Sequence, residues 1–360
     1  MSYFTTMNLP APPGARFHEL LKDYWGRPQD ALMEFEKQLA SFFDVPKVST
    51  WTNCFTAMAL ALLHATRGRS KKVAISGLAY RRTVDIVEWA GLQPVLVDNS
   101  PMTLAMDVQA LQQTLAQDDI GAILMQHPMV HIADVAAFTE VAQAFGVPIM
   151  FDSVEATGGC YQGRKIGRFG LAEAFSLHPS KVINAAEGGV LTFGAASNHA
   201  LFQESMKQLG VLCPKTGAPH LFGLEPVHAI MGLASLEIYD EVTARHERQY
   251  LRYQNGLSGL SGLELVAYDK DARPNYKSIL VHVKSGSGHH RQQLLEHLEF
   301  LGIGARSYYA PLHRRTAGYS LPQAQRLSEQ YFILPIGTSV NFDAIDTICA
   351  AIRDFEQGGG

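Results

Sequence analysis

Between residues 70 and 195 the chain alternates short apolar runs with segments whose apolar residues recur at helical spacing. Runs that are apolar throughout are typical of strands buried on both faces, and helices between such strands make them parallel. The apolar runs lie at 73–78, 94–98, 121–126 and 148–152, and the helical segments lie at 82–91, 107–117 and 133–146. The sequence therefore predicts an α/β fold in which helices cover both faces of a mostly parallel sheet.

Several polar residues stand where such a fold places a ligand site. Asp98, Gln126 and Asp152 each end a predicted strand, and ligands of parallel sheets bind beyond the carboxyl ends of the strands. A further helix is predicted to begin near Asn53 and Cys54. Because the first amide groups of a helix have no partner within the helix, this end is suited to hold a phosphate.

The remaining segments extend this fold on both sides. Helices are expected over 30–43 and 52–65, and one long helix over 231–257 is expected to lead out of the sheet. A smaller α+β part is predicted from the segments 278–283, 291–302, 303–309 and 331–336. We therefore predict a large domain over 1–235, a small C-terminal domain over 236–357 and a flexible tail over 358–360.

The charge balance and the cysteines argue against several kinds of partner. The net charge is −4 and no segment is dominated by Lys or Arg, so we expect neither nucleic acid nor an anionic membrane as a partner. The four cysteines show no metal-ligand spacing, and we interpret them as reduced thiols of a cytoplasmic protein that binds no metal. With no signal-peptide pattern at the start and no apolar run of about 18 residues, we expect neither export nor a membrane span.

The stretch over 151–193 contains the residue types that pyridoxal 5′-phosphate (PLP) chemistry requires. This cofactor needs a lysine amine for its aldehyde, a carboxylate beside its ring nitrogen and donors for its phosphate. Asp152 ends a predicted strand, and Lys181 follows 29 positions later, shortly before the pair Gly188–Gly189. Because the surroundings of Lys181 are apolar, we expect the pKa of its amine to be lowered, which favours the free amine that attacks carbonyl groups.

An ordered set of motifs makes the chain resemble a known family. The segments that carry the resemblance are EFEKQLASFFDVPKV (34–48), AGLQPVLVD (90–98), FDSVEATGGCYQGRKIGRFG (151–170), FSLHPSK with EGG (175–189), GIGARSYYAPLH (302–313) and LPQAQRLSEQYFILPI (321–336). In this order they resemble the DegT/StrS-type sugar aminotransferases, which are fold-type I PLP enzymes of the aspartate aminotransferase superfamily. The resemblance implies a large domain with a mostly parallel mixed sheet between helices, and a smaller α+β domain.

The resemblance also implies roles for individual residues. Lys181 would hold PLP as a Schiff base and later carry a proton, and Asp152 would pair with the ring nitrogen. Glu155 would lie near the 3-hydroxyl of PLP, although a local salt bridge is an equal alternative. Ser176 would donate to the phosphate, and Tyr80 would stack on the PLP ring. Asn53, Cys54 and Phe55, at the start of the 52–65 helix, would be the remaining cofactor contacts.

On the substrate side the candidates are His178, His313 and Tyr309, which lie inside the family's motifs. A single histidine is more often structural, and this alternative stays open for both. Cys54 is equally suited to be a small buried hydrophobe. The pair His289–His290 is interpreted as part of a solvated loop.

The sequence departs from the family's pattern in three places. Cys54–Phe55 stands where the family has Gly-Thr, and Glu155 replaces the usual amide or imidazole. Leu221 stands where the family has an Asn that reaches the phosphate across the dimer interface; His220 and Lys215 are the candidates to replace it.

We therefore expect a PLP-dependent aminotransferase that moves an amino group from an amino acid, with glutamate the first candidate, to a keto sugar linked to a nucleotide. Two alternatives are a PLP enzyme for a cyclitol or small keto acid, and a family relative without catalytic activity. The resemblance implies a homodimer with a shared site, and the apolar segment 220–234 is the candidate interface.

Overall fold

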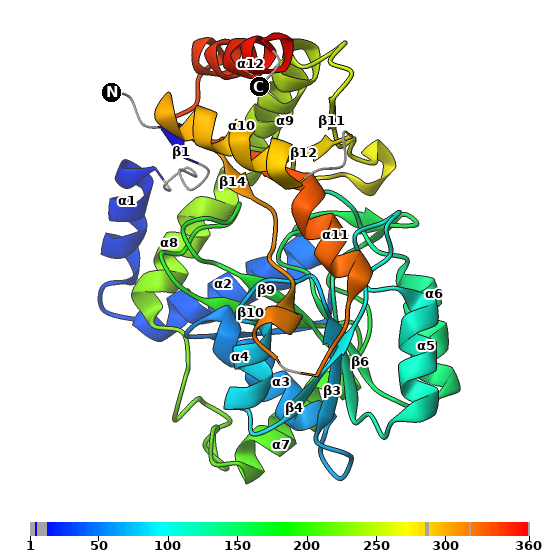
Figure 1. Ribbon diagram of the computed structural model, residues 1–360. Coiled ribbons are helices and arrows are strands. Elements are labelled where there is room, and N and C mark those ends of the chain that lie inside the picture. The colour runs from blue at the N-terminus through cyan, green and yellow to red at the C-terminus, as the bar shows by residue number, and fades with distance from the viewer. Residues whose placement is uncertain (1–3, 6–12, 285–287, 317, 359–360) are drawn as a thin grey trace.

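The computed structural model describes residues 4–5, 13–284, 288–316 and 318–358. Two sheets organise the described chain, one of seven strands and one of four. In Figure 1 the elements that follow residue 239 lie mostly above the large sheet.

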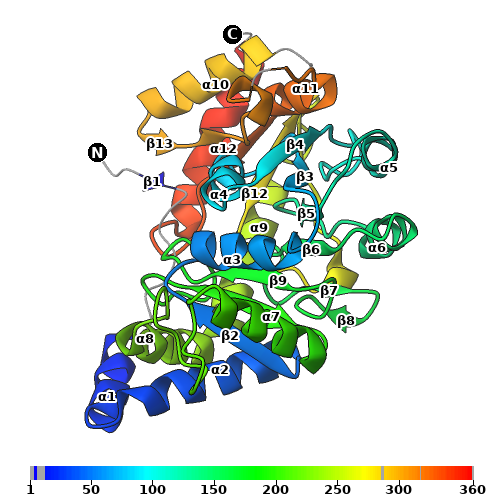
Figure 2. The same ribbon diagram turned by 90° about the horizontal axis from the view of Figure 1, so that it is seen from below.

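The large sheet has the mostly parallel mixed topology that the sequence predicts. From one edge to the other its order is β4 (Gln93–Val97), β3 (Lys72–Ser76), β5 (Ala122–Gln126), β6 (Ile149–Asp152), β9 (Glu173–Ser176), β10 (Gly189–Phe193) and β2 (Lys47–Trp51) (Figure 2). Neighbours from β4 to β9 are parallel, whereas β10 is antiparallel to both β9 and β2. The register pairs Gln126 with Asp152, so these two predicted strand ends lie side by side.

Helices cover both faces of this sheet because successive strand residues point to opposite sides. Ile75 packs in one apolar cluster with α3 (Cys54–Ala65), α4 (Thr83–Trp89) and α7 (Ala196–Gln208). Its neighbour Ala74 packs in another cluster with α5 (Val108–Gln117) and α6 (Val135–Ala144). The helix ends follow local signals: the side chains of Asn53, Asp107 and Asp134 accept hydrogen bonds from the first turns of α3, α5 and α6.

The predicted single helix over 231–257 is wrong. The segment forms α8 (Pro226–Glu237) and α9 (Tyr239–Gly256), separated at Ile238. The two helices have different packing partners: α8 lies against α1 (Gly14–Tyr24) and α2 (Pro28–Phe43), as Figure 2 shows, whereas α9 lies against α12 (Phe342–Gln357). The contact of α8 with α2 is close, because a Cβ on Gly232 would lie 2.3 Å from the Phe35 ring. A change of direction between α8 and α9 serves both contacts.

The smaller sheet is antiparallel and consists of β11 (Leu263–Leu265), β12 (Ile279–Val283), β15 (Tyr331–Leu334) and β14 (Arg306–Ser307). It is accompanied by α9, α10 (Gly288–Phe300), α11 (Pro322–Gln330) and α12, and by the short 3-10 helices η1 (Lys270–Ala272) and η2 (Leu312–Arg314). The minor pairs are β1 (Phe4–Thr5) with β13 (Ile303–Gly304), and β7 (Cys160–Tyr161) with β8 (Arg164–Lys165).

One prediction for this part needs correction. His289 and His290 belong to α10 rather than to a loop, and His290 Nε2 lies 2.6 Å from a carboxylate oxygen of Glu356 on α12. Gly358 closes α12, because its amide donates to the Asp354 carbonyl at 2.9 Å. The other two residues of the predicted tail lie outside the described residues.

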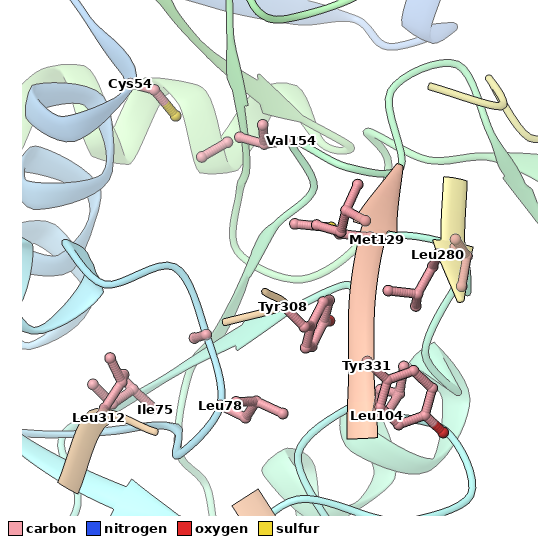
Figure 3. Packing of buried hydrophobic residues seen from close by; sticks show 14 of the residues in the cluster. Cys54, Ile75, Leu78, Leu104, Met129, Val154, Leu280, Tyr308, Leu312 and Tyr331 are labelled. Atoms are coloured by element: carbon pink, nitrogen blue, oxygen red, sulfur yellow. The ribbon is translucent and has the colours of Figure 1, made fainter. Parts of the chain in front are cut away.

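One apolar cluster joins the two sheets. It includes Ile75 of the large sheet, Leu280 and Tyr331 of the smaller sheet, and Tyr308, which follows β14. Figure 3 shows Tyr308 and Leu280 near Met129, which follows β5. The domain boundary at 235/236 stays a prediction, since the apolar packing is continuous between the two sheets.

Candidate active site

The first turn of α3 lies close to the start of β10, the strand that follows the loop with Lys181, because residue 189 is a glycine. A Cβ on Gly189, the first residue of β10, would lie 2.4 Å from the Asn53 carbonyl oxygen and 2.6 Å from the Cys54 Cα. The side chain of Asn53 is occupied as the helix cap, since its oxygen accepts from the Thr56 amide at 2.8 Å. The amides of Cys54 and Phe55 stand in the first turn, where a helix supplies no partner of its own.

The side chains of Cys54 and Phe55 have other surroundings. Cys54 is buried, and burial raises the pKa of its thiol well above its ordinary value. The Phe55 ring packs edge-on against Trp89 at 5.9 Å and lies under the guanidinium of Arg82. The backbone of these two residues, rather than their side chains, is therefore the part suited to bind an anion.

Lys181 lies in the connection between β9 and β10. Its amide donates to the His178 carbonyl at 2.9 Å, and three residues later the Asn184 amide donates to Ser235 Oγ of α8 at 2.8 Å. The side chain of Lys181 is 18% exposed. These two hydrogen bonds hold the backbone of the loop around Lys181, while the side chain of Lys181 remains partly accessible.

Glu155 is the centre of the charged cluster. Its Oε1 lies 2.9 Å from Lys181 Nζ and its Oε2 lies 2.5 Å from Lys277 Nζ. All three side chains are largely buried, with exposed fractions of 6% for Glu155, 18% for Lys181 and 8% for Lys277. Burial alone would raise the pKa of Glu155, but the two ammonium groups more than offset this effect and hold the pKa well below its ordinary range. The carboxylate is therefore ionised and shared between two cations.

The prediction that the pKa of Lys181 is lowered is wrong. Burial lowers the pKa of the amine as anticipated, but the ion pair with Glu155 acts in the opposite direction and prevails, so the pKa is raised. The sequence showed the apolar surroundings of Lys181, whereas the carboxylate partner comes from 26 positions earlier in the chain.

Asp152 ends β6 and is 5% exposed. Burial raises the pKa of its carboxyl to about 6, while the Val154 amide, which donates to Oδ1 at 3.2 Å, acts in the opposite direction. The charge of Lys181 also lowers this pKa, which places the two groups within electrostatic range. Among the described residues, no cation forms an ion pair with Asp152.

Lys277 and Asn275 were missed by the sequence analysis. They come from the segment before β12, and the Asn275 Nδ2 donates to the carbonyl oxygens of Glu155 at 3.1 Å and Thr157 at 3.0 Å. Burial lowers the pKa of Lys277 to about 8, against the influence of Glu155. The available signal was a lysine two residues before an apolar strand, a position that needs a charged partner once the strand is buried.

The phosphate and substrate candidates of the lysine motif lie close together. Ser176 ends β9, and its Oγ accepts from the His178 amide at 3.3 Å. The His178 ring is exposed, and its Nδ1 lies 3.0 Å from Ser180 Oγ. Both side chains therefore belong to the turn that leads to Lys181.

Tyr80 and Asp98 follow neighbouring strands but have different surroundings. The Tyr80 amide donates to Gln126 Oε1 at 3.1 Å, and its side chain is 46% exposed. The carboxylate of Asp98 accepts from the amides of Gln323 at 3.1 Å and Ala324 at 2.8 Å. Asp98 therefore holds the start of α11 against the large sheet.

The last two substrate candidates come from the segment between β14 and α11. This segment crosses the end of β3, because the Leu312 amide donates to the Gly77 carbonyl at 2.8 Å. His313 follows in η2, and its Nδ1 is buried without a hydrogen-bond partner among the described residues. Burial and the charge of Glu155 raise the pKa of Tyr309, so this phenol lies within the influence of the charged cluster.

The residues present fit PLP. A lysine amine, a buried carboxyl with no cationic partner among the described residues, and free amides at a helix start are brought to one end of the large sheet. A cationic ring nitrogen is the partner that Asp152 lacks. Within the described ranges, we find no group of three or more His, Cys, Asp or Glu side chains placed to hold a metal ion.

Comparison with known proteins gives the family. The sequence model of the DegT/DnrJ/EryC1/StrS aminotransferase family matches residues 14–353. The chain therefore belongs to this family, as its motifs indicated, and the family is one of aminotransferases.

Individual relatives cover most of the chain. GDP-perosamine synthase of Caulobacter vibrioides is 30% identical over 288 residues, which are 78% of this chain and 77% of that protein. EpsN of Bacillus subtilis, whose name describes a pyridoxal phosphate-dependent aminotransferase, is 27% identical over 312 residues, which are 82% of this chain and 78% of EpsN. The structure of DesI, determined in the presence of its TDP-sugar product, matches with a TM-score of 0.87 and 24% identity, covering 99% of this chain and 94% of that one. This likeness confirms the predicted fold class.

Proposed function

We propose that this chain is a PLP-dependent aminotransferase that moves an amino group from an amino acid, glutamate in the first instance, to a keto sugar linked to a nucleotide. The observation that carries the proposal is the partly accessible amine of Lys181, which lies within electrostatic range of a buried carboxyl, that of Asp152 at the end of β6. Family membership and the names of relatives that make amino sugars support it.

Bound PLP would supply an aldehyde for the amine and a ring that withdraws electrons from the reacting carbon. Lys181 is the residue to bind that aldehyde and to move a proton at its Nζ. Asp152 would keep the ring nitrogen protonated. Its carboxylate is buried without a cationic partner among the described residues, and this favours an ion pair with the protonated nitrogen. The amides of Cys54 and Phe55 would bind the phosphate, with Ser176 as a further donor.

Tyr80 is proposed to cover the cofactor ring, and Glu155 is proposed to lie on the side of its hydroxyl. His178, His313 and Tyr309 are the proposed substrate contacts. Support for the last two is their place in the segment that crosses the end of the large sheet.

The proposed assembly is a homodimer with a shared site. Within the candidate segment 220–234, Ala229, Ile230, Leu233 and Ala234 are buried by the chain's own packing. Leu221 and Phe222 are exposed instead, by 52% and 36%, and the Phe222 ring packs against the exposed Trp89, next to Phe55. An apolar patch beside the start of α3 is well placed to meet a second copy at the site.

The proposed location is the cytoplasm. All four cysteines are free, which suits a reducing compartment. Among the described helices, none combines the length and apolarity needed to cross a bilayer.

The test is the absorption spectrum of the purified protein with added PLP, before and after glutamate. An imine band near ~420 nm that moves toward ~330 nm with glutamate is expected for the wild type and not for Lys181→Ala. Lys284→Ala, which changes an exposed lysine in the small part, is the matched control. A wild-type protein without the imine band would refute the proposal.

The substrate is tested in the reverse direction with α-ketoglutarate as the amino acceptor. We expect glutamate to form with UDP-, GDP- or TDP-linked amino sugars and not with the same sugars lacking the nucleotide. Equal rates for both would assign the enzyme to small keto substrates instead.

A further inference from the structure

Glu155 has two cationic partners whose side chains differ in exposure. Lys181 lies in the β9–β10 connection and keeps 18% of its side chain exposed. Lys277 is 8% exposed, its amide donates to Asn275 Oδ1 at 3.1 Å, and the next amide, of Ser278, donates to the Tyr268 hydroxyl at 3.1 Å. Lys277 is thus the more enclosed partner, and Lys181 is the one with more access to a ligand.

A single cationic partner for Glu155 would not be enough during the proposed reaction. A buried carboxylate needs a compensating charge, and removing the only partner of such a group is strongly destabilising. Lys181 has to lose its proton to react with an aldehyde, and at that moment it stops compensating Glu155. With Lys277 at 2.5 Å on the other oxygen, the carboxylate keeps a counter-charge throughout.

We propose that Lys277 is a positioning residue of the active site, acting through Glu155 as its standing counter-ion, which frees Lys181 to lose its proton and bind the cofactor. The pair Glu155–Lys277 then does the work of the single amide or imidazole side chain that the family's pattern has at position 155. This inference rests on the proposed function for its cofactor step, whereas its charge arrangement is tested without cofactor.

Other charges around the pair do not replace Lys277. Asp152 of β6 and Arg306 of β14 are the charged groups that act on the cluster from neighbouring elements. His246 of α9 also lies near Lys277, but burial lowers the pKa of its ring to about 4, so it carries no charge near neutral pH. The tyrosines whose pKa values the Glu155 charge raises are Tyr268, Tyr308 and Tyr309, which remain neutral hydroxyls. Only Lys181 and Lys277 form ion pairs with Glu155 among the described residues.

The first experiment measures the melting temperature of cofactor-free protein in a set of variants. Either lysine alone compensates Glu155, so Lys181→Met and Lys277→Met are each expected to lower the melting temperature little. The double variant leaves the carboxylate unpaired, and its loss is expected to exceed the two single losses together by several degrees, more at pH 8 than at pH 5. Adding Glu155→Gln to the double variant is expected to recover most of the loss.

The second experiment titrates the imine band with PLP against pH. Lys277→Met is expected to weaken PLP binding about tenfold near neutral pH and to move the midpoint of imine formation about one pH unit higher, because Lys181 then leaves Glu155 uncompensated. Lys277→Arg keeps the charge and is expected to stay within about threefold of the wild type. In a Glu155→Gln background, Lys277→Met is expected to change binding by less than about threefold. Lys284→Met is the matched surface control.

Either experiment can overturn the inference. Strictly additive melting losses, or a double variant that Glu155→Gln does not rescue, would show that the lysines do not share the carboxylate. An equal effect of Lys277→Met with Glu155 and with Gln at this position would show that Lys277 acts on the cofactor directly. If the wild type forms no imine, the proposed function fails while the melting experiment still decides the charge arrangement.

Discussion

Replacing Asp152 by Asn is expected to stabilise the cofactor-free protein. The carboxyl is 5% exposed, and burial raises its pKa to about 6 from an ordinary value of 3.8. Between these two pH values the folded protein holds the proton more firmly than the unfolded chain does. The free energy of unfolding therefore falls as pH rises from about 4 to about 6 and stays lower above that range.

The size of the effect follows from the two pKa values. A difference of about two pH units corresponds to about 3 kcal/mol, since each unit is worth about 1.4 kcal/mol. The amide introduced by Asp152→Asn would have no charge to desolvate, and its oxygen would still accept the hydrogen bond that the Val154 amide donates to Asp152. The variant should thus match the wild type below pH 4 and exceed it by up to about 3 kcal/mol at pH 7.

The assay is urea unfolding of both proteins, freed of cofactor, at several pH values from 4 to 8. Asp118→Asn is a control of opposite sign. Asp118 is a partly exposed carboxylate whose pKa is lowered by Lys72 at 2.6 Å, so its removal should lose a little stability at neutral pH. A difference between Asp152→Asn and wild type that does not change with pH would refute the reasoning. With PLP present the order should reverse, because the carboxylate then has the ring nitrogen as a partner.

The remaining predictions concern how the site is held. Asn275→Ala removes three hydrogen bonds and should lower the free energy of unfolding in urea by about 2–3 kcal/mol. The control Asn198→Ala removes one hydrogen bond and should lower it by about 1 kcal/mol. Equal losses would contradict the role of Asn275 in holding the segment before β12 to the loop of Glu155. Gly189→Ala places a Cβ 2.4 Å from a carbonyl oxygen at the start of α3 and should cost about 1–3 kcal/mol and weaken PLP binding, while Gly26→Ala, with open space around it, should do neither. Asp98→Ala removes the acceptor of two amides at the start of α11 and should lower the free energy of unfolding by about 1 kcal/mol, and an unchanged melting curve would show that α11 needs no such cap.

Local signals in the sequence determined most of the large sheet. The predicted strands and helices between 70 and 195 are confirmed because apolar runs and end residues act over a few positions. Gly91 and Gly146 are the last residues of the predicted helical segments 82–91 and 133–146, and both have the left-handed backbone, with φ of 69° and 65°, that other residues adopt with strain. Lys181 and Asp152 were recognisable for the same reason, as each belongs to a short motif at the end of a strand.

Only the tertiary structure decided which charges meet. Glu155 and Lys277 are 122 positions apart in the chain, and no local pattern relates a loop after β6 to the segment before β12. The ion pair of Glu155 with Lys181 reversed the expected direction of the Lys181 pKa, and the separate packing of α8 and α9 divided the predicted long helix. Helix and strand formation depends on near neighbours, whereas an ion pair depends on how two sheets pack, and that arrangement follows from the whole chain.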